Sequence, residues 1–301
     1  MQPAPSLDDI AGSAAARVGA VSSNDITITP IDVPRGESLV LHGDMAGHGA
    51  TILALHGLTA TRRYVFHGSR VLERAGFKTI AYDARGHGQS GGPHEPGEYT
   101  YDHLVADAIA VLDHHEIDRA VLAGHSMGTA TAAATALQHP ERVSALVLVG
   151  PAHRGAPSDN QPRWDALANG LAADGVEGFM TAFGTPNLPG RLSETVLKVV
   201  RQRLSRHEDM LALSACLSGV TRTAAFDGLA QLEKIDVPTL VVGSRDDSDP
   251  DHPLSIAETY AARIPGAGLI VEGAGESPLA WRGGTLSKAV LEFLSDQGIH
   301  P

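Results

Sequence analysis

One pentapeptide, Gly-His-Ser-Met-Gly at residues 124–128, constrains the fold of this chain more than any other stretch of its sequence. Residues 119–123 before it read as a short buried strand, and residues 129–138 after it are almost all alanine, threonine and leucine, which predicts a closely packed helix. A tight turn from strand to helix needs glycine on both sides of the serine, because side chains there would collide with the neighbouring elements. Such a turn exposes the Ser126 hydroxyl beside a helix N-terminus, where free N–H groups favour a developing oxyanion. The motif therefore predicts a nucleophilic serine rather than a simple small-residue turn.

Strands and helices are expected to alternate along most of the chain. Continuous apolar runs such as 51–55 are typical of strands covered on both faces. From residue 50 onward the alternation implies an α/β fold with a parallel, doubly wound sheet, and the first two strands predict an antiparallel hairpin at its edge. Strands are expected at 26–29, 38–42, 51–55, 78–82, 119–123, 143–149, 239–242 and 268–271, and helices at 67–75, 101–115, 129–138, 253–263 and 285–294.

The alternation stops between residues 150 and 237, where no strand is evident. A single crossover helix needs only about a dozen residues, so this interval is too long for one. Helical spacing recurs in it, at 164–173, 176–183, 193–204 and 208–220. We therefore expect a helical cap at 151–232, inserted into a core domain made of residues 25–150 and 233–301, with a flexible N-terminal tail at 1–24.

The composition limits the class of partner. The chain has 35 acidic and 23 basic side chains and a net charge of −12, which disfavours binding to nucleic acid or to an anionic membrane. A single cysteine, Cys216, excludes an internal disulfide and fits a reducing compartment. The first 25 residues lack a basic start followed by an apolar stretch, so they do not predict a secretory signal. No apolar run approaches the roughly 20 residues that cross a bilayer. We expect a cytoplasmic protein with a small-molecule acyl substrate, and a homodimer is compatible with these features.

No motif points to a metal or a cofactor. The 15 histidines are many for this length, but no pair shows the spacing of metal ligands with carboxylates on one face. Neither a phosphate-binding loop nor a dinucleotide fingerprint is present in the sequence. The expected cofactor and metal content is therefore none.

Together, four motifs resemble those of the α/β-hydrolase superfamily, and the resemblance covers about residues 25–298. In chain order they are Leu-His-Gly-Leu at 55–58, Asp-Ala-Arg-Gly-His-Gly-Gln-Ser at 83–90, the serine pentapeptide, and Gly-Ser-Arg-Asp at 243–246. The resemblance implies that the backbone N–H groups of Leu58 and Met127 form an oxyanion hole, each worth about 3 kcal/mol. It also implies that Asp246 is the triad carboxylate.

One position departs from the superfamily pattern. The family places its general base, a histidine, just after the last strand, where this chain has Glu276. The only later histidine is His300 in the C-terminal tail. Without a base of near-neutral pKa, the Ser126 hydroxyl keeps the weak nucleophilicity of an alcohol.

Three explanations are compatible with this departure. In the first, the triad is rewired: His252, on the loop that normally carries only the acid, reaches Ser126 and is oriented by Asp246, Asp249 or Glu276, because triads are defined by geometry rather than chain order. The competing interpretation of His252 is a solvated residue at a helix start. In the second, the protein no longer hydrolyses and is a lyase, isomerase, acyltransferase or ligand-binding protein. In the third, a single residue has been altered at position 276.

The rewired serine hydrolase is the leading hypothesis. Serine at the turn suits esters, lactones and thioesters through an acyl-enzyme, whereas epoxide hydrolysis or dehalogenation through an alkyl-enzyme ester would need a carboxylate there. The segment 83–90 is interpreted as structural, with Asp83 paired to Arg85. The substrate pocket is expected between the cap and the sheet edge, lined by Leu58, Met127, His56, His125, His153, Trp164, Phe179, Met180 and Phe183.

Overall fold

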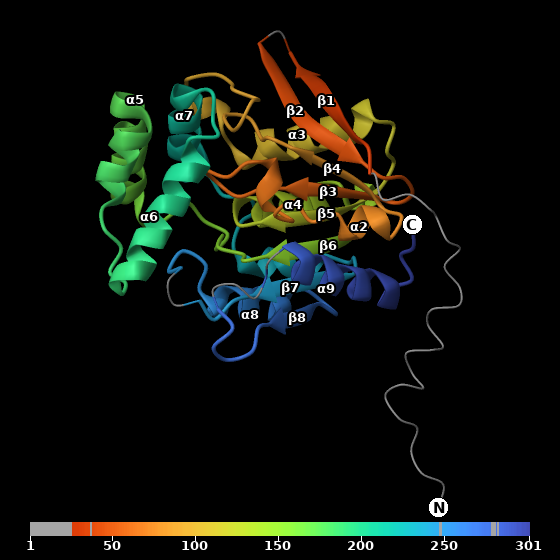
Figure 1. Ribbon diagram of the computed structural model, residues 1–301. Coiled ribbons are helices and arrows are strands. Elements are labelled where there is room, and N and C mark those ends of the chain that lie inside the picture. Colours follow the sequence, from red (N-terminus) through yellow and green to blue (C-terminus); the bar gives the residue numbers. More distant parts are fainter. Residues whose placement is uncertain (1–25, 37, 247–248, 278–280, 282) are drawn as a thin grey trace, which may run out of the picture.

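The computed structural model describes residues 26–36, 38–246, 249–277, 281 and 283–301, and the predicted tail at 1–24 lies outside them. The strands are β1 (Ile28–Arg35), β2 (Leu39–Ala46), β3 (Thr51–Leu55), β4 (Lys78–Tyr82), β5 (Ala120–His125), β6 (Val143–Val149), β7 (Thr239–Gly243) and β8 (Gly268–Val271). They form an eight-stranded sheet in the order β1-β2-β4-β3-β5-β6-β7-β8 (Figure 1). β2 pairs antiparallel with β1 and with β4, and the remaining neighbours are parallel. This mostly parallel, doubly wound sheet confirms the predicted fold class.

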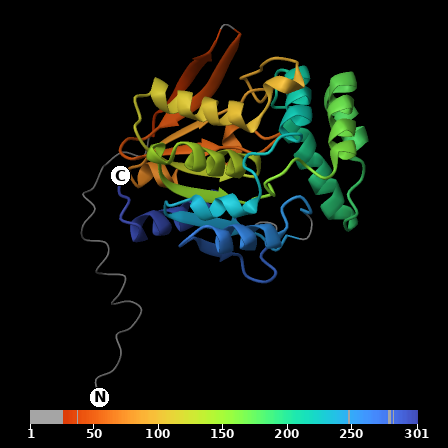
Figure 2. The same ribbon diagram turned by 180° about the vertical axis from the view of Figure 1, so that it is seen from behind.

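Two layers of helices cover the sheet. The helices in these layers are α2 (Val71–Arg74), α3 (Tyr101–His114), α4 (Met127–Gln138), α8 (Leu254–Arg263) and α9 (Gly283–Asp296). Because successive side chains of a strand point to opposite faces, β3 contributes to two cores. Leu53 and Leu55 pack with α3, α4 and α8, whereas Ile52 and Ala54 pack with α2 and α9. The two views of the ribbon show these layers on opposite faces of the sheet (Figures 1 and 2).

The N-terminal hairpin is longer than the sequence predicted. β1 includes Pro30 and Pro34, both of which lie beyond the strand predicted at 26–29. Both prolines are tolerated because β1 is an edge strand, where a missing backbone N–H removes no ladder hydrogen bond on the open side. The hairpin pairs Ile28 with Ala46 and Arg35 with Leu39.

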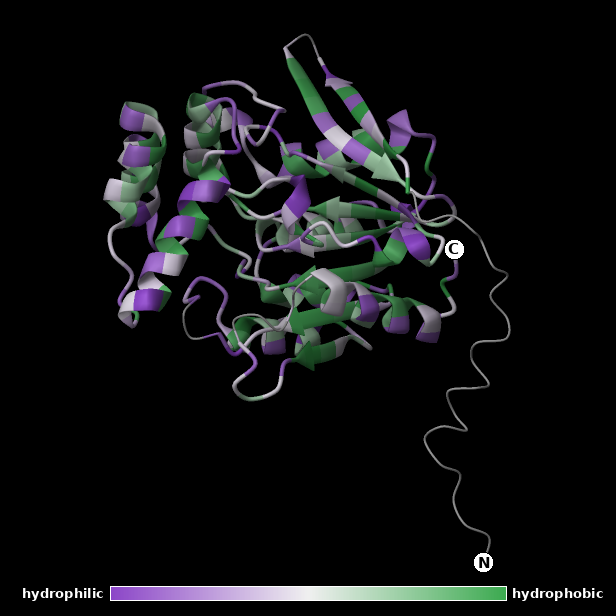
Figure 3. Ribbon diagram, in the orientation of Figure 1, coloured by the Kyte–Doolittle hydropathy of each residue, from purple (hydrophilic) through white to green (hydrophobic). Residues whose placement is uncertain are grey.

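Between β6 and β7 the chain forms α5 (Gln161–Phe183), α6 (Gly190–Leu204) and α7 (Met210–Val220), and this fully described interval contains no strand. These helices stand apart from the two layers, at one end of the sheet (Figure 1). Non-helical angles at Asp174 and Gly175 divide α5 into two arms, which matches the two helices predicted there. The central strands are mainly hydrophobic, whereas α5 and α6 alternate polar and apolar bands (Figure 3). In the described part of the chain, no helix combines the length and the apolar character needed to span a membrane.

A buried ion cluster joins the hairpin to α3. The carboxylate of Asp107 is fully buried and accepts hydrogen bonds from Arg85 Nε at 2.7 Å, Arg85 Nη2 at 2.8 Å and Arg35 Nε at 2.8 Å. Asp83 is occupied elsewhere, because it accepts from the Arg62 backbone N–H at 2.8 Å and pairs with the Arg62 guanidinium. The predicted Asp83–Arg85 pair is therefore wrong: each residue has a different partner.

We predict that Asp107→Ala lowers the free energy of unfolding by about 3–5 kcal/mol, because it leaves the buried Arg85 cation uncompensated. Asp113→Ala is the matched control on the same helix, since its exposed pair with Arg142 contributes about 0–1 kcal/mol. Urea denaturation of both variants measures the difference. Equal destabilisation by the two changes would contradict the structural role of the buried cluster.

Candidate active site

The turn between β5 and α4 has the geometry expected of the pentapeptide. Ser126 has φ 52° and ψ −114°, a strained conformation for a residue with a side chain. A Cβ at Gly124 would overlap the backbone of Gly128, and a Cβ at Gly128 would overlap the carbonyl of Leu55. The two glycines therefore allow α4 to pack directly against the sheet, with Ser126 at the tip of the turn.

The Ser126 hydroxyl lies against an imidazole from another part of the chain. Ser126 Oγ is 2.7 Å from Nε2 of His252, and the other ring nitrogen, Nδ1, is 2.8 Å from Oδ2 of Asp249. Hydroxyl, imidazole and carboxylate thus form one continuous hydrogen-bonded chain. The side chain of His252 is 19% exposed and that of Asp249 is 48% exposed, so the carboxylate end of the chain faces solvent.

A turn at residues 249–252 places this histidine. The His252 N–H donates to the Asp249 carbonyl at 3.3 Å, and the Asp249 N–H in turn donates to the Asp246 carbonyl at 3.1 Å. Asp249 and Pro250 occupy the first two positions of the turn, which those residue types favour. The ring of His252 then lies against Gly150 at the end of β6, where a Cβ would be 3.6 Å from the ring.

The protonation state follows from the carboxylate. Burial alone would raise the pKa of Asp249, but the hydrogen bond from His252 and the charge of that ring lower the pKa overall. An ionised carboxylate only accepts hydrogen bonds, so Nδ1–H of His252 donates to Asp249. In the neutral imidazole this leaves Nε2 as the hydrogen-bond acceptor facing the Ser126 hydroxyl. This tautomer is the one that a general base requires.

Three carboxylates were candidates to orient His252, and the one paired with its Nδ1 is Asp249 rather than Asp246 or Glu276. The Asp246 N–H donates to Ser244 Oγ at 3.2 Å. Asp246 lines a second cavity, which is described below. Glu276 is exposed, and its Oε2 accepts from the Gly273 N–H at 2.8 Å. Glu276 lines neither of the two cavities near Ser126.

The two residues predicted to supply the oxyanion hole, Leu58 and Met127, lie near the serine. Gly57 packs on the turn so closely that a Cβ there would be 3.0 Å from Cβ of Ser126. The next residue, Leu58, and Met127 at the start of α4 both line the cavity beside Ser126. Backbone N–H groups at these two positions are the predicted donors to a negatively charged oxygen.

A cavity of about 630 Å³ opens beside Ser126, between the sheet edge and the helices α5 to α7. Of the predicted lining residues, Met180 packs inside the helical segment and does not line the cavity. His56 does not line it either, because its ring is buried, with Nε2 accepting from the Ala84 N–H at 2.9 Å. Residues that do line it include Leu58, Met127, His125, His153, Trp164, Phe179 and Phe183.

The other histidines of the site are neutral. Burial and the neighbouring His252 lower the pKa of His125 to about 3, and burial lowers that of His153 to about 4. Burial also lowers the pKa of His56. His153 Nε2 accepts from the Ala225 N–H at 3.0 Å, and the Trp164 indole N–H donates to Ser158 at 2.9 Å, so both rings are fixed as walls.

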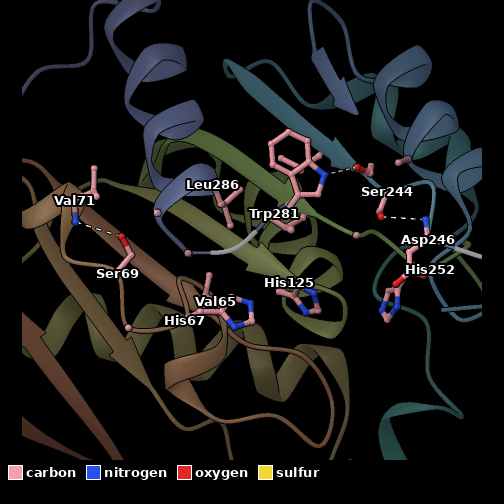
Figure 4. A pocket seen from close by; sticks show the side chains of 18 of the residues that line it. Val65, His67, Ser69, Val71, His125, Ser244, Asp246, His252, Trp281 and Leu286 are labelled. Atoms are coloured by element: carbon pink, nitrogen blue, oxygen red, sulfur yellow. Dashed lines mark hydrogen bonds between the residues drawn. The ribbon is translucent and has the colours of Figure 1, made fainter. Parts of the chain in front are cut away.

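A second cavity of about 780 Å³ adjoins the first, and Figure 4 shows it from close by. His67, His125 and His252 line both cavities. Trp281 closes the far side, where its indole N–H donates to the Gly243 carbonyl at 2.8 Å (Figure 4). Among the described residues, no group of three or more His, Cys, Asp or Glu side chains could hold a metal ion.

Sequence reasoning missed part of the lining. Tyr64, Tyr101 and Arg203 all line the cavity beside Ser126, although they come from three distant segments. No local motif marks them. A helix-face analysis of α6 could have singled out Arg203 as a charged residue one position before the buried Leu204.

The chain belongs to the family described as the alpha/beta hydrolase fold, which matches residues 50–282. It is 31% identical to "Epoxide hydrolase 3" of Siraitia grosvenorii over 48% of this chain and 42% of that protein, so it spans less than half of that relative. Among solved structures, a hydrolase from Pseudomonas aeruginosa PA01 is 27% identical with a TM-score of 0.68, over 91% of this chain and 99% of that one. The enol-lactonase from Burkholderia xenovorans LB400 is 25% identical with a TM-score of 0.69, over 85% and 97%.

The loop after β8 is tied to the loop after β7 by Glu272. Its Oε1 accepts from Ser244 Oγ at 2.7 Å and from the Arg245 N–H at 2.6 Å, and it also accepts from Ser277. Burial opposes ionisation, but these hydrogen bonds outweigh it and lower the pKa of Glu272 to about 2. Glu276, at the position where the family usually has its base, therefore lies on a loop that the Glu272 carboxylate holds in place.

We predict that Glu272→Gln flattens the acid-side decline in stability. A carboxyl group with a folded pKa of about 2 and an ordinary value of 4.5 stabilises the fold above pH 4.5, and this contribution is lost as the pH falls towards 2. Urea denaturation at several pH values from about 5 to about 3 measures the decline. The exposed Glu258→Gln is the control, and its slope should equal that of the wild type.

Proposed function

We propose that this protein is a serine hydrolase that cleaves carboxylic esters, lactones or thioesters through an acyl-enzyme on Ser126. The observation that carries the proposal is the 2.7 Å contact between Ser126 Oγ and His252 Nε2. This contact supplies a candidate general base within hydrogen-bond distance of the hydroxyl. The sequence had left the identity of that base open, because Glu276 occupies the usual histidine position. In this proposal His252 is the general base and Asp249 orients it.

The first half of the reaction forms the acyl-enzyme. Ser126 Oγ attacks the carbonyl carbon of the substrate while its proton passes to His252 Nε2. Asp249 stabilises the imidazolium through the Nδ1–H bond. The N–H groups of Leu58 and Met127 hold the oxyanion of the tetrahedral intermediate. Its collapse breaks the bond to the leaving alkoxide or thiolate, which takes the proton from Nε2.

The second half regenerates the serine. A water molecule enters beside the acyl group and gives a proton to His252 Nε2 as its oxygen attacks the acyl carbon. The second tetrahedral intermediate expels Ser126 Oγ, which recovers the proton from Nε2. The product carboxylic acid then leaves. The proposed cycle uses only water and side-chain and backbone groups of this chain.

The comparisons support hydrolysis but not a particular substrate. The enol-lactonase and the hydrolase share the fold and nearly their whole length with this chain, and an enol-lactone has the acyl carbon that this mechanism needs. The likeness to an epoxide hydrolase does not favour epoxides here, because the residue at the turn is Ser126 rather than a carboxylate. We further propose that residues 151–232 act as a cap that selects the acyl group.

We predict that a fluorophosphonate probe labels the wild-type protein at Ser126 and that Ser126→Ala abolishes both labelling and hydrolysis of short p-nitrophenyl esters. The reason is that the nucleophile cannot be replaced by a neighbouring group. Mass spectrometry of the labelled peptide identifies the site. A wild-type protein that is neither labelled nor active across a broad ester panel would favour a ligand-binding or lyase function instead.

We also predict that His252→Ala lowers kcat about a thousandfold or more, because triad members act as a unit. Asp249→Asn should lower kcat less, about a hundredfold, because the carboxylate faces solvent and its field is partly screened. Asp246→Asn and Glu276→Gln are the carboxylate controls and should stay within about threefold of the wild type.

Greater loss of activity in Asp246→Asn than in Asp249→Asn, with both variants folded, would contradict this assignment of the acid. A double variant, His252→Ala with Glu276→His, completes the test. It should remain inactive, because position 276 is exposed and its side chain turns back to the Gly273 N–H. Recovery of activity would show that the loop after β8 still presents a working base position.

A further inference from the structure

The cavity beside Ser126 contains one cation that the described residues do not neutralise. Arg163 is paired with Asp251 through two hydrogen bonds, of 2.7 and 3.1 Å, so this pair contributes no net charge. Arg154 and Asp159 are exposed, and their charges are hydrated. Of the aspartate, glutamate, lysine and arginine residues that line the cavity, the one that remains is Arg203.

Arg203 lies near the end of α6, the cap helix that faces the site. Its Nε is enclosed and has no hydrogen-bond partner among the described residues. Burial lowers the pKa of its guanidinium, against the attraction of Tyr64, Asp249 and Asp251. Both carboxylates already have nearer partners, because Asp249 holds His252 and Asp251 holds Arg163. Neither is therefore available to Arg203 as an ion-pair partner.

The enclosed Nε–H group is costly without a partner, since its lost hydrogen bond to water is not replaced, although the residue as a whole is half-buried. Arginine at this position gains nothing from packing that a long neutral side chain would not provide, whereas it does provide a planar fork of donors suited to a carboxylate. The guanidinium carries a single positive charge, and the aspartates nearby oppose further negative charge. A singly charged carboxylate therefore fits this site better than a doubly charged phosphate.

We infer that the acyl substrate carries a carboxylate, separate from the bond that is cleaved, and that Arg203 binds it. This inference rests on the proposed hydrolase function and narrows the substrate class. Trp164, Leu167, Phe179 and Phe183 contribute apolar walls to the same cavity. The substrate class is thus a carboxylate-bearing ester, thioester or lactone whose two polar ends are joined by a short apolar chain.

The test compares matched pairs of esters that differ only in charge. Monomethyl esters of the straight-chain dicarboxylic acids from succinic to suberic acid are each compared with the corresponding methyl ester monoamide, which is neutral and of nearly equal size. At the best chain length, kcat/KM of the wild type should favour the acid about tenfold or more. Arg203→Gln should reduce this ratio to about one, and Arg203→Lys should restore part of it.

Arg206→Gln is the matched control, because it removes the same charge from an exposed residue just beyond α6 that does not line the cavity. Its ratio should equal that of the wild type. Two results would overturn the inference and leave the hydrolase proposal intact. One is a wild type that hydrolyses the monomethyl ester acids and the methyl ester monoamides equally well at all chain lengths. The other is an acid-to-amide ratio of kcat/KM that is unchanged in Arg203→Gln. Circular dichroism confirms that each variant is folded.

A binding measurement separates this inference from the proposed function. Calorimetric titration of Ser126→Ala with the same ester pairs does not depend on turnover. If the wild type hydrolyses no ester, the hydrolase proposal fails, but tighter binding of the acids that disappears on adding Arg203→Gln still supports the carboxylate site. Equal binding of acids and amides, or no binding of either, counts against it.

Discussion

The backbone of Ser126 is the constraint on which the rest of the site depends. Its positive φ is strained, and the strain is maintained because α4 is pressed against β3 and β5 through the missing side chains of Gly124 and Gly128. The same sheet places the ends of β3, β6 and β7 beside the turn. The loops that carry Leu58 and His252 therefore follow other strands of the same sheet, and the conformation of one turn becomes the centre of a site built from several segments.

Local patterns predicted those parts of the molecule that local physics determines. The parallel sheet, the helical interval between β6 and β7 and the position of Ser126 follow from apolar runs, helical spacing and the glycines of the turn. Leu58 and Met127 line the cavity because their positions are fixed relative to that turn. The structure also brings His252 to Ser126, as the hypothesis of a rewired triad required, although its catalytic role stays a prediction.

The remaining features depend on distances between segments, which a sequence pattern does not contain. Three carboxylates were candidates to orient His252, and the choice of Asp249 results from the turn at residues 249–252, which contains Pro250. Glu276 is exposed and accepts a hydrogen bond within its own loop, and Glu272 joins that loop to Ser244 and Arg245 of the loop after β7. Asp83 and Arg85 lie two residues apart, yet each is drawn to a partner on another element.

The acid and the base of the proposed triad stand three residues apart on one loop. In the arrangement that the superfamily resemblance implied, they come from two loops, and an insertion or deletion in either would separate them. Here the pair is inherited as a single short stretch of chain. Evolution is then free to lengthen, shorten or recompose residues 273–276 without disturbing the chemistry, provided that Glu272 and its partner Ser277 persist. The same stretch is also a natural unit for transplantation, since one loop exchange would carry both partners to another protein of this fold.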